Sequence, residues 1–123
     1  LYQRYLVETE IGDIIQSHFA NGIPVAGFSA GALVAPERCV IPEIDQRDGQ
    51  RLRLPGLALL KDAVVCVHYE TWDEAAHLKE SFTEEATSWA YGLADASGIY
   101  LQDQHLIATE GIDPVVLSRS RVK

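Results

Sequence analysis

The sequence contains few of the residues on which specialised architectures depend. It has only two cysteines among 123 residues, Cys39 and Cys66, and no methionine. Two cysteines are too few for a disulfide framework, and their spacing is not that of a metal site. Both lie in apolar stretches, so we expect two buried free thiols. We expect no metal and no cofactor.

Positive charge is also scarce. The chain has 10 Lys and Arg residues against 18 Asp and Glu residues, a net charge of -8 and a pI of about 4.8. No Lys- or Arg-rich run is present to neutralise phosphates, which argues against nucleic acid and against an anionic membrane surface as partners. No apolar run approaches the length of a membrane span. No secretory signal is visible, and we expect a cytoplasmic protein.

Helical patterns alternate with short apolar runs along the chain. This alternation predicts an α/β fold with a mainly parallel, doubly wound sheet. Because the chain opens at Leu1 and enters a helical pattern almost at once, we expect one α/β domain over residues 1–123 that is incomplete at its N-terminus. The expected helices are 5–20, 30–35 and 72–89, the last with a break near 83–85. The expected strands are 23–28, 39–44, 63–68, 91–94 and 115–118, with an exposed polar loop or hairpin tip at 45–53 and a C-terminal β-hairpin built from 98–101 and 105–108.

One segment predicts a nucleophile. Gly27-Phe28-Ser29-Ala30-Gly31 reads G-x-S-x-G and directly follows the apolar run 23–28. In the order strand, tight turn, helix, this motif places the serine on a sharp turn with its hydroxyl exposed at the strand end. Glycines flank it because neighbouring backbone passes too close for a Cβ. The motif predicts that Ser29 is a nucleophile; the alternative is a Gly/Ser-rich turn without chemistry.

A serine hydroxyl needs a base to remove its proton. Four histidines compete for that role: His18, His68, His77 and His105. His68 ends an apolar strand, and the carboxyl ends of strands line the ligand crevice in α/β sheets, where Ser29 is also expected. The other three occupy helix-surface or hairpin positions. Alternatives for His68 are a half-buried structural histidine and a nucleophilic pair with Cys66, although side chains on one face of a strand point in parallel.

The base is usually oriented by a carboxylate. The downstream candidates are Glu70, Asp73, Glu74, Asp95 and Asp103. Asp95 follows the apolar run 91–94 and is therefore expected at a strand end, which predicts a Ser-His-Asp triad in that chain order. The alternative for Asp95 is a turn residue preceding Ser97-Gly98.

Four segments together resemble a known family. They are residues 23–32 (IPVAGFSAGA), 54–57 (LPGL), 65–69 (VCVHY) and 91–96 (YGLADA). They are similar to the cyanophycinase and aspartyl dipeptidase (peptidase E) family. In that family a G-x-S-A-G-A elbow precedes a GL-x-L segment, a strand ending in His-Phe or His-Tyr, and a Gly-hydrophobic-x-acidic segment. The resemblance covers most of the chain, from the first helix to the hairpin.

The resemblance implies a fold like that of class I glutamine amidotransferases, of which this chain would be the C-terminal part, and a serine exopeptidase that cleaves next to acidic residues. It implies Ser29 as the nucleophile, His68 as the general base, and Asp95 as the orienting acid in place of the family's usual Glu. Glu43 or Asp45, a little after the elbow, would match another acid sometimes assigned to the relay.

The resemblance also bears on the oxyanion hole and on partners. The family's Gly-Gly motif precedes the first helix of this chain, so the Ala30 amide is the oxyanion-hole donor expected here. The expected partners are a small peptide substrate and either an N-terminal fragment of the same protein or a second copy. A non-catalytic, ligand-binding relative and an amidotransferase-like or esterase domain are the alternative functions. Residues that could bind a substrate carboxylate are Arg38, Arg47, Arg51 and Arg53, whose default setting is a solvated loop.

Overall fold

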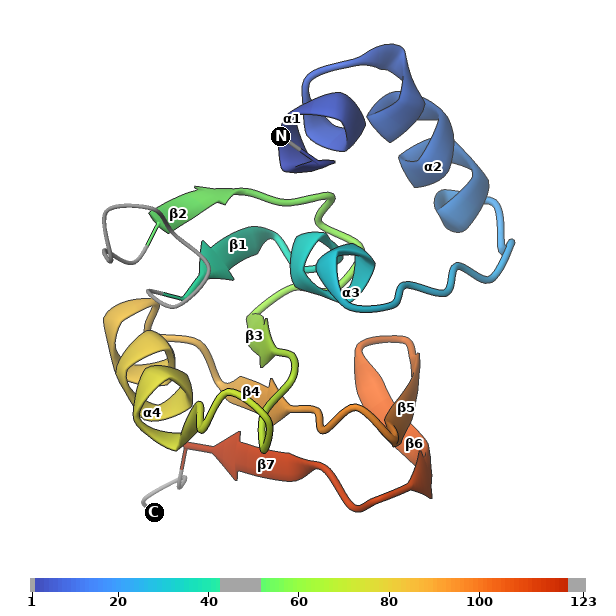
Figure 1. Ribbon diagram of the computed structural model, residues 1–123. Helices are drawn as coiled ribbons and strands as arrows, with labels where there is room; N and C mark the ends of the chain where they lie inside the picture. The colour runs from blue at the N-terminus through green and yellow to red at the C-terminus, as the bar shows by residue number, and fades with distance from the viewer. Residues whose placement is uncertain (1, 43–51, 120–123) are drawn as a thin grey trace. The chain divides into compact units, whose positions relative to one another are not determined.

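The computed structural model describes residues 2–42 and 52–119. The chain divides into two compact units, residues 1–61 and 62–123, which are considered separately. Among the described residues, the first unit has three helices and one strand pair, and the second has one helix and five strands; Figure 1 labels these elements. The fold is α/β with mixed sheets. Among the strands described, β3 and β4 form the parallel pair and the other pairings are antiparallel.

Two consecutive helices begin the first unit. They are α1 (Tyr2–Val7) and α2 (Glu10–Ala20), where one helix over 5–20 was expected. Thr9 separates them because its backbone is extended, and its hydroxyl accepts a hydrogen bond from the Ile11 amide while donating to the Tyr5 carbonyl. Thr9 is therefore the N-cap of α2, and its side chain satisfies a helix-terminal amide that has no intrahelical partner.

The segment after α2 differs from its expected structure. Residues 23–28 form no strand, and Phe28 is 85% exposed. A strand requires neighbouring backbone to accept and donate its ladder hydrogen bonds, and no described strand pairs with this segment. Apolar character alone was therefore an insufficient signal for a strand at 23–28.

An antiparallel pair and a short helix complete the first unit. Helix α3 (Ala30–Val34) precedes β1 (Arg38–Ile41), which pairs with β2 (Leu52–Pro55). The segment after β2 returns to α3, where the Leu57 amide donates to the Val34 carbonyl at 2.7 Å. Both α1 and α2 are hydrogen bonded to this segment. Gln3 in α1 donates to the Pro55 carbonyl, and Gln16 in α2 donates to the Leu57 carbonyl. The buried side chains of this unit include Leu33, Val34, Cys39, Val40, Leu57, Leu59 and Leu60.

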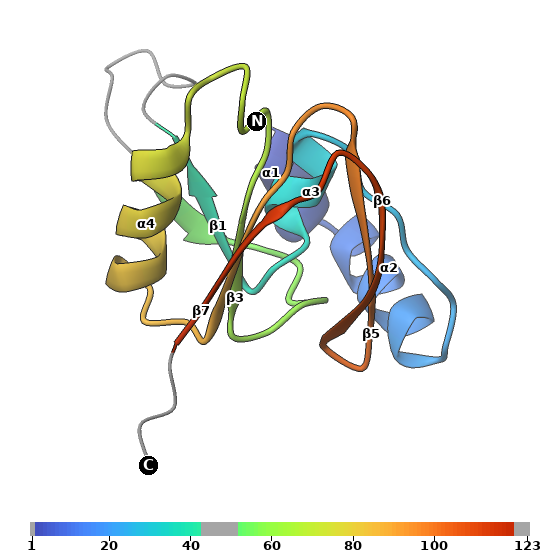
Figure 2. The same ribbon diagram turned by 90° about the horizontal axis from the view of Figure 1, so that it is seen from below.

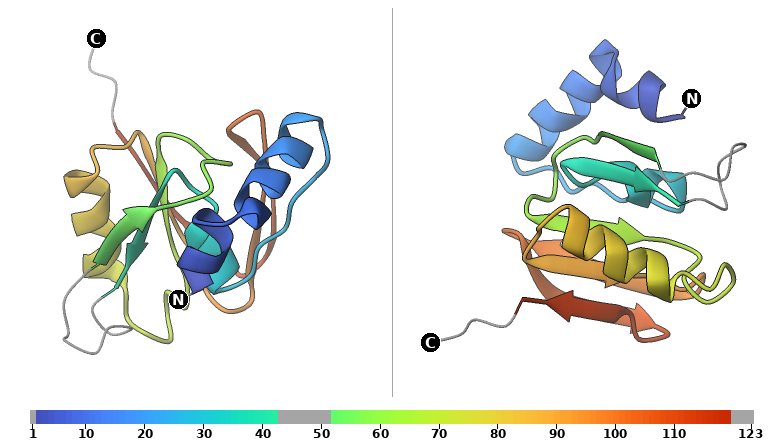
Figure 3. Two further views of the ribbon diagram at one scale, coloured as in Figure 1. Left: turned by 90° about the horizontal axis from the view of Figure 1, so that it is seen from above. Right: turned by 90° about the vertical axis from the view of Figure 1, so that its left-hand side faces the viewer.

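The second unit is built on a parallel strand pair with its crossover helix. Strand β3 (Ala63–Cys66) leads through α4 (Ala75–Glu84) to β4 (Trp89–Gly92), and β7 (Val115–Ser118) adds to β4 in the antiparallel sense. Helix α4 packs against β3 and β4 on one side of this sheet (Figure 3). The core of the second unit includes Val64, Val65, Leu78, Ala90 and Tyr91.

A β-hairpin lies between β4 and β7, as the sequence predicted. Strands β5 (Ser97–Gln102) and β6 (His105–Gly111) pair in the antiparallel sense (Figure 2). Gln102 and His105 are paired, so the turn consists of Asp103 and Gln104, with φ of 52° and 72°. Two consecutive positive φ values are typical of the tight turn that matches the twist of a hairpin.

The two cysteines form no disulfide and are buried, with 1% of Cys39 and 2% of Cys66 exposed, as expected from the sequence. Burial raises the pKa of the Cys39 thiol to about 11. A thiol of this kind holds roughly 300-fold less thiolate at neutral pH than a free cysteine with a pKa of about 8.5. Cys39 is therefore expected to be inert in the folded protein.

We predict that Cys39 reacts with iodoacetamide at least roughly 300-fold more slowly in the native protein than in denaturant, because both access and ionisation are lost on burial. Peptide mass spectrometry of protein alkylated for increasing times would measure the rate at each cysteine separately. Equal rates at Cys39 with and without denaturant would contradict the burial of β1.

Candidate active site

Ser29 lies on a sharp turn at the start of α3. Its φ and ψ are 51° and -115°. Eight described residues other than glycine have positive φ, so that property alone does not distinguish Ser29. Its ψ, however, lies well outside the left-handed helical region, where non-glycine residues with positive φ usually fall. Such strained backbone is characteristic of functional positions, and it is the geometry that a nucleophile elbow requires.

The glycine two residues earlier makes this turn possible. A Cβ added to Gly27 would lie 2.6 Å from the Gly31 carbonyl oxygen and 2.7 Å from its carbon. The turn is closed by the Gly31 amide, which donates to the Phe28 carbonyl at 2.8 Å. Gly27 is therefore required because the backbone crosses itself here, as the motif predicted.

The Ala30 amide is the oxyanion donor expected from the sequence. Ala30 is the first residue of α3 and directly follows the candidate nucleophile. Amides in the first turn of a helix have no intrahelical acceptor. Such an amide is suited to stabilise the negative charge that develops on a carbonyl oxygen attacked by the adjacent hydroxyl.

His68 and Asp95 follow two neighbouring strands. His68 comes two residues after the end of β3, and Asp95 three residues after the end of β4. Because β3 and β4 are parallel neighbours, their carboxyl ends lie at the same edge of the sheet. The backbone joins the two loops: the Leu93 amide donates to the Cys66 carbonyl at 2.9 Å, and the Tyr69 amide to the Leu93 carbonyl at 3.0 Å.

The side chains of His68 and Asp95 are hydrogen bonded, with 2.6 Å between Nδ1 and Oδ1. An ionised carboxylate can only accept, so Nδ1 carries the proton in this contact. In the neutral imidazole, Nε2 is then the unprotonated nitrogen that can accept a proton. The histidine side chain is 29% exposed and the aspartate side chain 57% exposed, so solvent reaches the pair.

The carboxylate of Asp95 is held in its charged form. The hydrogen bond from His68, followed by one from Thr71, lowers the pKa of Asp95 below its ordinary value. Both donors favour the ionised carboxylate over the neutral acid. Asp95 therefore remains an acceptor, as an orienting acid must.

The loop after β3 forms a turn that includes residues not recognised from the sequence. The Trp72 amide donates to the His68 carbonyl at 2.8 Å, and φ of His68 is 52°. This turn brings the Thr71 hydroxyl to Asp95 Oδ2 at 3.0 Å and the Trp72 ring to 4.5 Å from the imidazole, between ring centroids. The helix was expected to begin at Trp72 but begins at Ala75, which is why the turn was missed. A threonine three residues after a histidine carries no general sequence signal.

Other sequence candidates fall elsewhere. His77 was expected on the surface but is only 5% exposed, because it lies on the face of α4 that also buries Leu78 and Ser81. His18 and His105 are exposed. The sequence argument against a nucleophilic pair of Cys66 and His68, that their side chains point in parallel, requires a strand that continues to the histidine. The strand ends at Cys66, so its side-chain alternation does not extend to the histidine.

Among the acidic alternatives, Glu70, Asp73 and Asp103 are exposed, whereas Glu74 is buried. Arg38 and Arg53 are exposed on β1 and β2. The sequence candidates that lie outside the described residues are Glu43, Asp45, Arg47 and Arg51. Ser29 belongs to the first unit, and His68 and Asp95 belong to the second.

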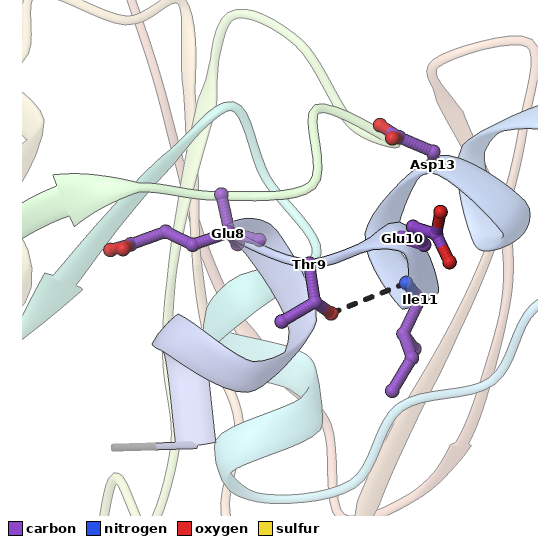
Figure 4. A pocket seen from close by; sticks show the side chains of 6 residues that line it. Glu8, Thr9, Glu10, Ile11 and Asp13 are labelled. Carbon is purple, nitrogen blue, oxygen red and sulfur yellow. Dashed lines mark hydrogen bonds between the residues drawn. The ribbon is translucent and has the colours of Figure 1, made fainter.

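A pocket lies where α1 meets α2 (Figure 4). It is lined by Glu8, Glu10 and Asp13, together with Val7, Thr9 and Ile11. Three carboxylates would repel an acidic substrate. The pocket therefore does not suit the acidic residue of the peptide substrates that the family resemblance implies.

Two general properties bear on the class of site. Within residues 2–42 and 52–119, no group of three or more His, Cys, Asp and Glu side chains is arranged to hold a metal ion. In the same part of the chain, no helix combines the length and apolar character needed to cross a membrane.

A comparison with protein families gives a match over most of the chain. Residues 3–111 match the family model described as Peptidase family S51. The match includes the elbow, the His68–Asp95 pair and the hairpin through Gly111. No curated protein matches the chain.

We predict that Gly27→Ala destabilises the first unit by about 1–3 kcal/mol, the usual cost of forcing atoms into filled space. Chemical denaturation would measure the free energy of unfolding. Gly98→Ala is the matched control, because a Cβ there meets nothing closer than 3.6 Å. Equal stability of the two variants would show that the backbone does not cross at Gly27.

The lowered pKa of Asp95 predicts a pH dependence of stability. A carboxyl group whose pKa is lower in the folded state stabilises the protein above its unfolded pKa, and that contribution is lost as pH falls through the folded pKa. Asp95→Asn should therefore reduce the loss of stability between about pH 6 and about pH 3. Denaturant titrations at both pH values would measure it, with Asp103→Asn in the exposed turn as control. A pH dependence unchanged by Asp95→Asn would contradict the His68–Asp95 contact.

Proposed function

Because the chain belongs to Peptidase family S51 and is a serine-type peptidase, we propose that it hydrolyses peptide bonds next to acidic residues through Ser29, His68 and Asp95. The observation that supports this most directly is the 2.6 Å hydrogen bond between His68 Nδ1 and Asp95 Oδ1. It leaves Nε2 as the acceptor that a general base needs. The proposal requires that Ser29 and His68 act on the same substrate.

In the proposed reaction, His68 Nε2 takes the proton of the Ser29 hydroxyl as Oγ attacks the scissile carbonyl carbon. The Ala30 amide donates to the oxyanion that forms. His68 then gives its proton to the leaving amine, and water hydrolyses the acyl-enzyme by the reverse sequence of proton transfers. Asp95 keeps the proton on Nδ1 throughout and stabilises the imidazolium.

Preference for an acidic residue is the finer part of the proposal. It rests on the resemblance of the four sequence segments to aspartyl dipeptidases. Arginine is the residue type best suited to pair with a substrate carboxylate, because its guanidinium can donate two parallel hydrogen bonds. The exposed Arg38 and Arg53 are the described candidates for this role.

We predict that the protein cleaves Asp-Leu more efficiently than Asn-Leu, which has the same shape without the charge. A charge-assisted hydrogen bond contributes about 1.5–3 kcal/mol, so kcat/KM should differ by roughly 10- to 150-fold. Ser29→Ala should lower kcat by roughly four orders of magnitude or more. Release of free leucine, followed by chromatography, would measure both quantities.

Labelling with a fluorophosphonate separates the parts of the proposal. Ser29 should be labelled in the wild-type protein, and His68→Ala should slow the labelling because the base is lost. Ser17→Ala and His105→Ala, at exposed positions in α2 and β6, are the controls. Equal rates of labelling with and without His68 would overturn its role as base. Equal cleavage of Asp-Leu and Asn-Leu would overturn only the acidic preference.

A further inference from the structure

The two carboxylate oxygens of Asp95 have different partners. Oδ1 bonds His68 Nδ1 at 2.6 Å, and Oδ2 accepts a hydrogen bond from the Thr71 hydroxyl at 3.0 Å. His68 and Thr71 are three residues apart in one turn, whereas Asp95 comes from the loop after the neighbouring strand. The carboxylate therefore connects two side chains of the same turn.

We propose that Thr71 is a positioning residue of the catalytic site, which fixes the imidazole of His68 by holding the carboxylate of Asp95. This inference rests on the proposed function, in which His68 is the base. Thr71 acts through Asp95 and contacts neither the substrate nor the reacting atoms.

Exposure is the reason that Asp95 needs a second partner. Its side chain is 57% exposed, so packing does not fix the rotation of the carboxylate about its last bond. A carboxylate on an sp³–sp² bond rotates within a broad, shallow energy profile. With Thr71 on Oδ2, rotation costs two hydrogen bonds instead of one, and Oδ1 stays directed at Nδ1.

The backbone sets the distance that Thr71 must bridge. The Trp72 amide closes the turn on the His68 carbonyl at 2.8 Å, and the Glu74 amide donates to the Tyr69 carbonyl at 2.9 Å. These bonds hold Thr71 at a fixed place relative to His68. The Trp72 ring, 4.5 Å from the imidazole and tilted by 44°, limits the other movement available to the histidine. The turn thus presents both the base and the residue that positions its acid.

A specific consequence for the tautomer follows. The proton remains on Nδ1 only while a carboxylate oxygen accepts it there. If Oδ1 turns away, the Nε2–H tautomer becomes populated, and that form cannot accept a proton from a serine hydroxyl. Loss of the Thr71 hydroxyl should therefore reduce the fraction of enzyme with a competent base, which lowers kcat and leaves substrate affinity unchanged.

The test compares Thr71→Val, which removes the hydroxyl at nearly constant volume, with Thr71→Ser, which keeps it. One hydrogen bond contributes about 0.5–1.5 kcal/mol, so kcat on Asp-Leu should fall roughly 2- to 12-fold in Thr71→Val with KM within about twofold. Thr71→Ser should restore kcat. Thr83→Val is the matched control, because that hydroxyl also makes one hydrogen bond in the same unit, to the Lys79 carbonyl in α4.

A second measurement does not depend on activity. The ¹⁵N shifts of the two ring nitrogens report which one carries the proton, and His68 can be assigned from the spectrum of His68→Gln. In wild type and Thr71→Ser the shifts should indicate the Nδ1–H form; in Thr71→Val they should move toward each other. If Thr71→Val does not fold, Thr71→Ala provides the same comparison without the added methyl group.

The outcomes are distinguishable. Unchanged nitrogen shifts in Thr71→Val, or a Thr71→Ser variant as impaired as Thr71→Val, would overturn the role of the hydroxyl. A tautomer shift in a protein that neither cleaves dipeptides nor labels at Ser29 would overturn the proposed function while supporting the positioning by Thr71. A loss of kcat equal to that of Thr83→Val would show only a structural effect and would also overturn the proposal.

Discussion

The parallel pairing of β3 with β4 is the constraint on which the His68–Asp95 pair depends. Residues 27 positions apart in the chain meet because both strands end at the same edge and pass directly into short loops. Two backbone hydrogen bonds fix the distance between the two loops: the Leu93 amide donates to the Cys66 carbonyl, and the Tyr69 amide donates to the Leu93 carbonyl. The side chains of His68 and Asp95 then form their hydrogen bond between loops whose positions are determined by the sheet.

The environment of this pair suits a base and its orienting acid better than a structural ion pair. Both side chains are partly exposed, so the charge of the carboxylate is not costly to maintain and solvent or substrate can reach the pair. The hydrogen bonds from His68 and Thr71 keep the aspartate ionised. The half-buried imidazole is bounded on one side by the Trp72 ring.

The elbow of Ser29 is governed by a different kind of constraint, one that is entirely local. Its strained φ and ψ are accommodated because Gly27 has no side chain to collide with Gly31. This crossing lies within five residues and does not require a sheet. It is found even though the apolar run ahead of it forms no strand in the described structure. The elbow can therefore form without the strand that usually precedes it.

Local chemistry explains most of what could be predicted from the sequence. Helices α2 and α3, the buried β3, the β5–β6 hairpin and the two buried thiols follow from periodicity, turn residues and apolar runs. The sequence did not delimit β2, the first half of which it assigned to a polar loop or hairpin tip, because the pairing with β1 depends on a partner distant in the chain. It also extended the helix before β4 beyond both ends of α4, although the break that it placed near 83–85 coincides with the end of α4 at Glu84.

The elbow follows from the residues of its own motif, because the clash that selects glycine occurs between near neighbours, and the positions of His68 and Asp95 after apolar runs indicated both residues. Three features became known only from the folded chain: the bond of the histidine to Asp95 instead of Glu70, Asp73 or Asp103, the contact of Thr71 with the second carboxylate oxygen, and the burial of His77. Each of these depends on which strands become neighbours and on where the turns between them direct side chains. Such contacts join residues far apart in the chain, and no local pattern encodes them.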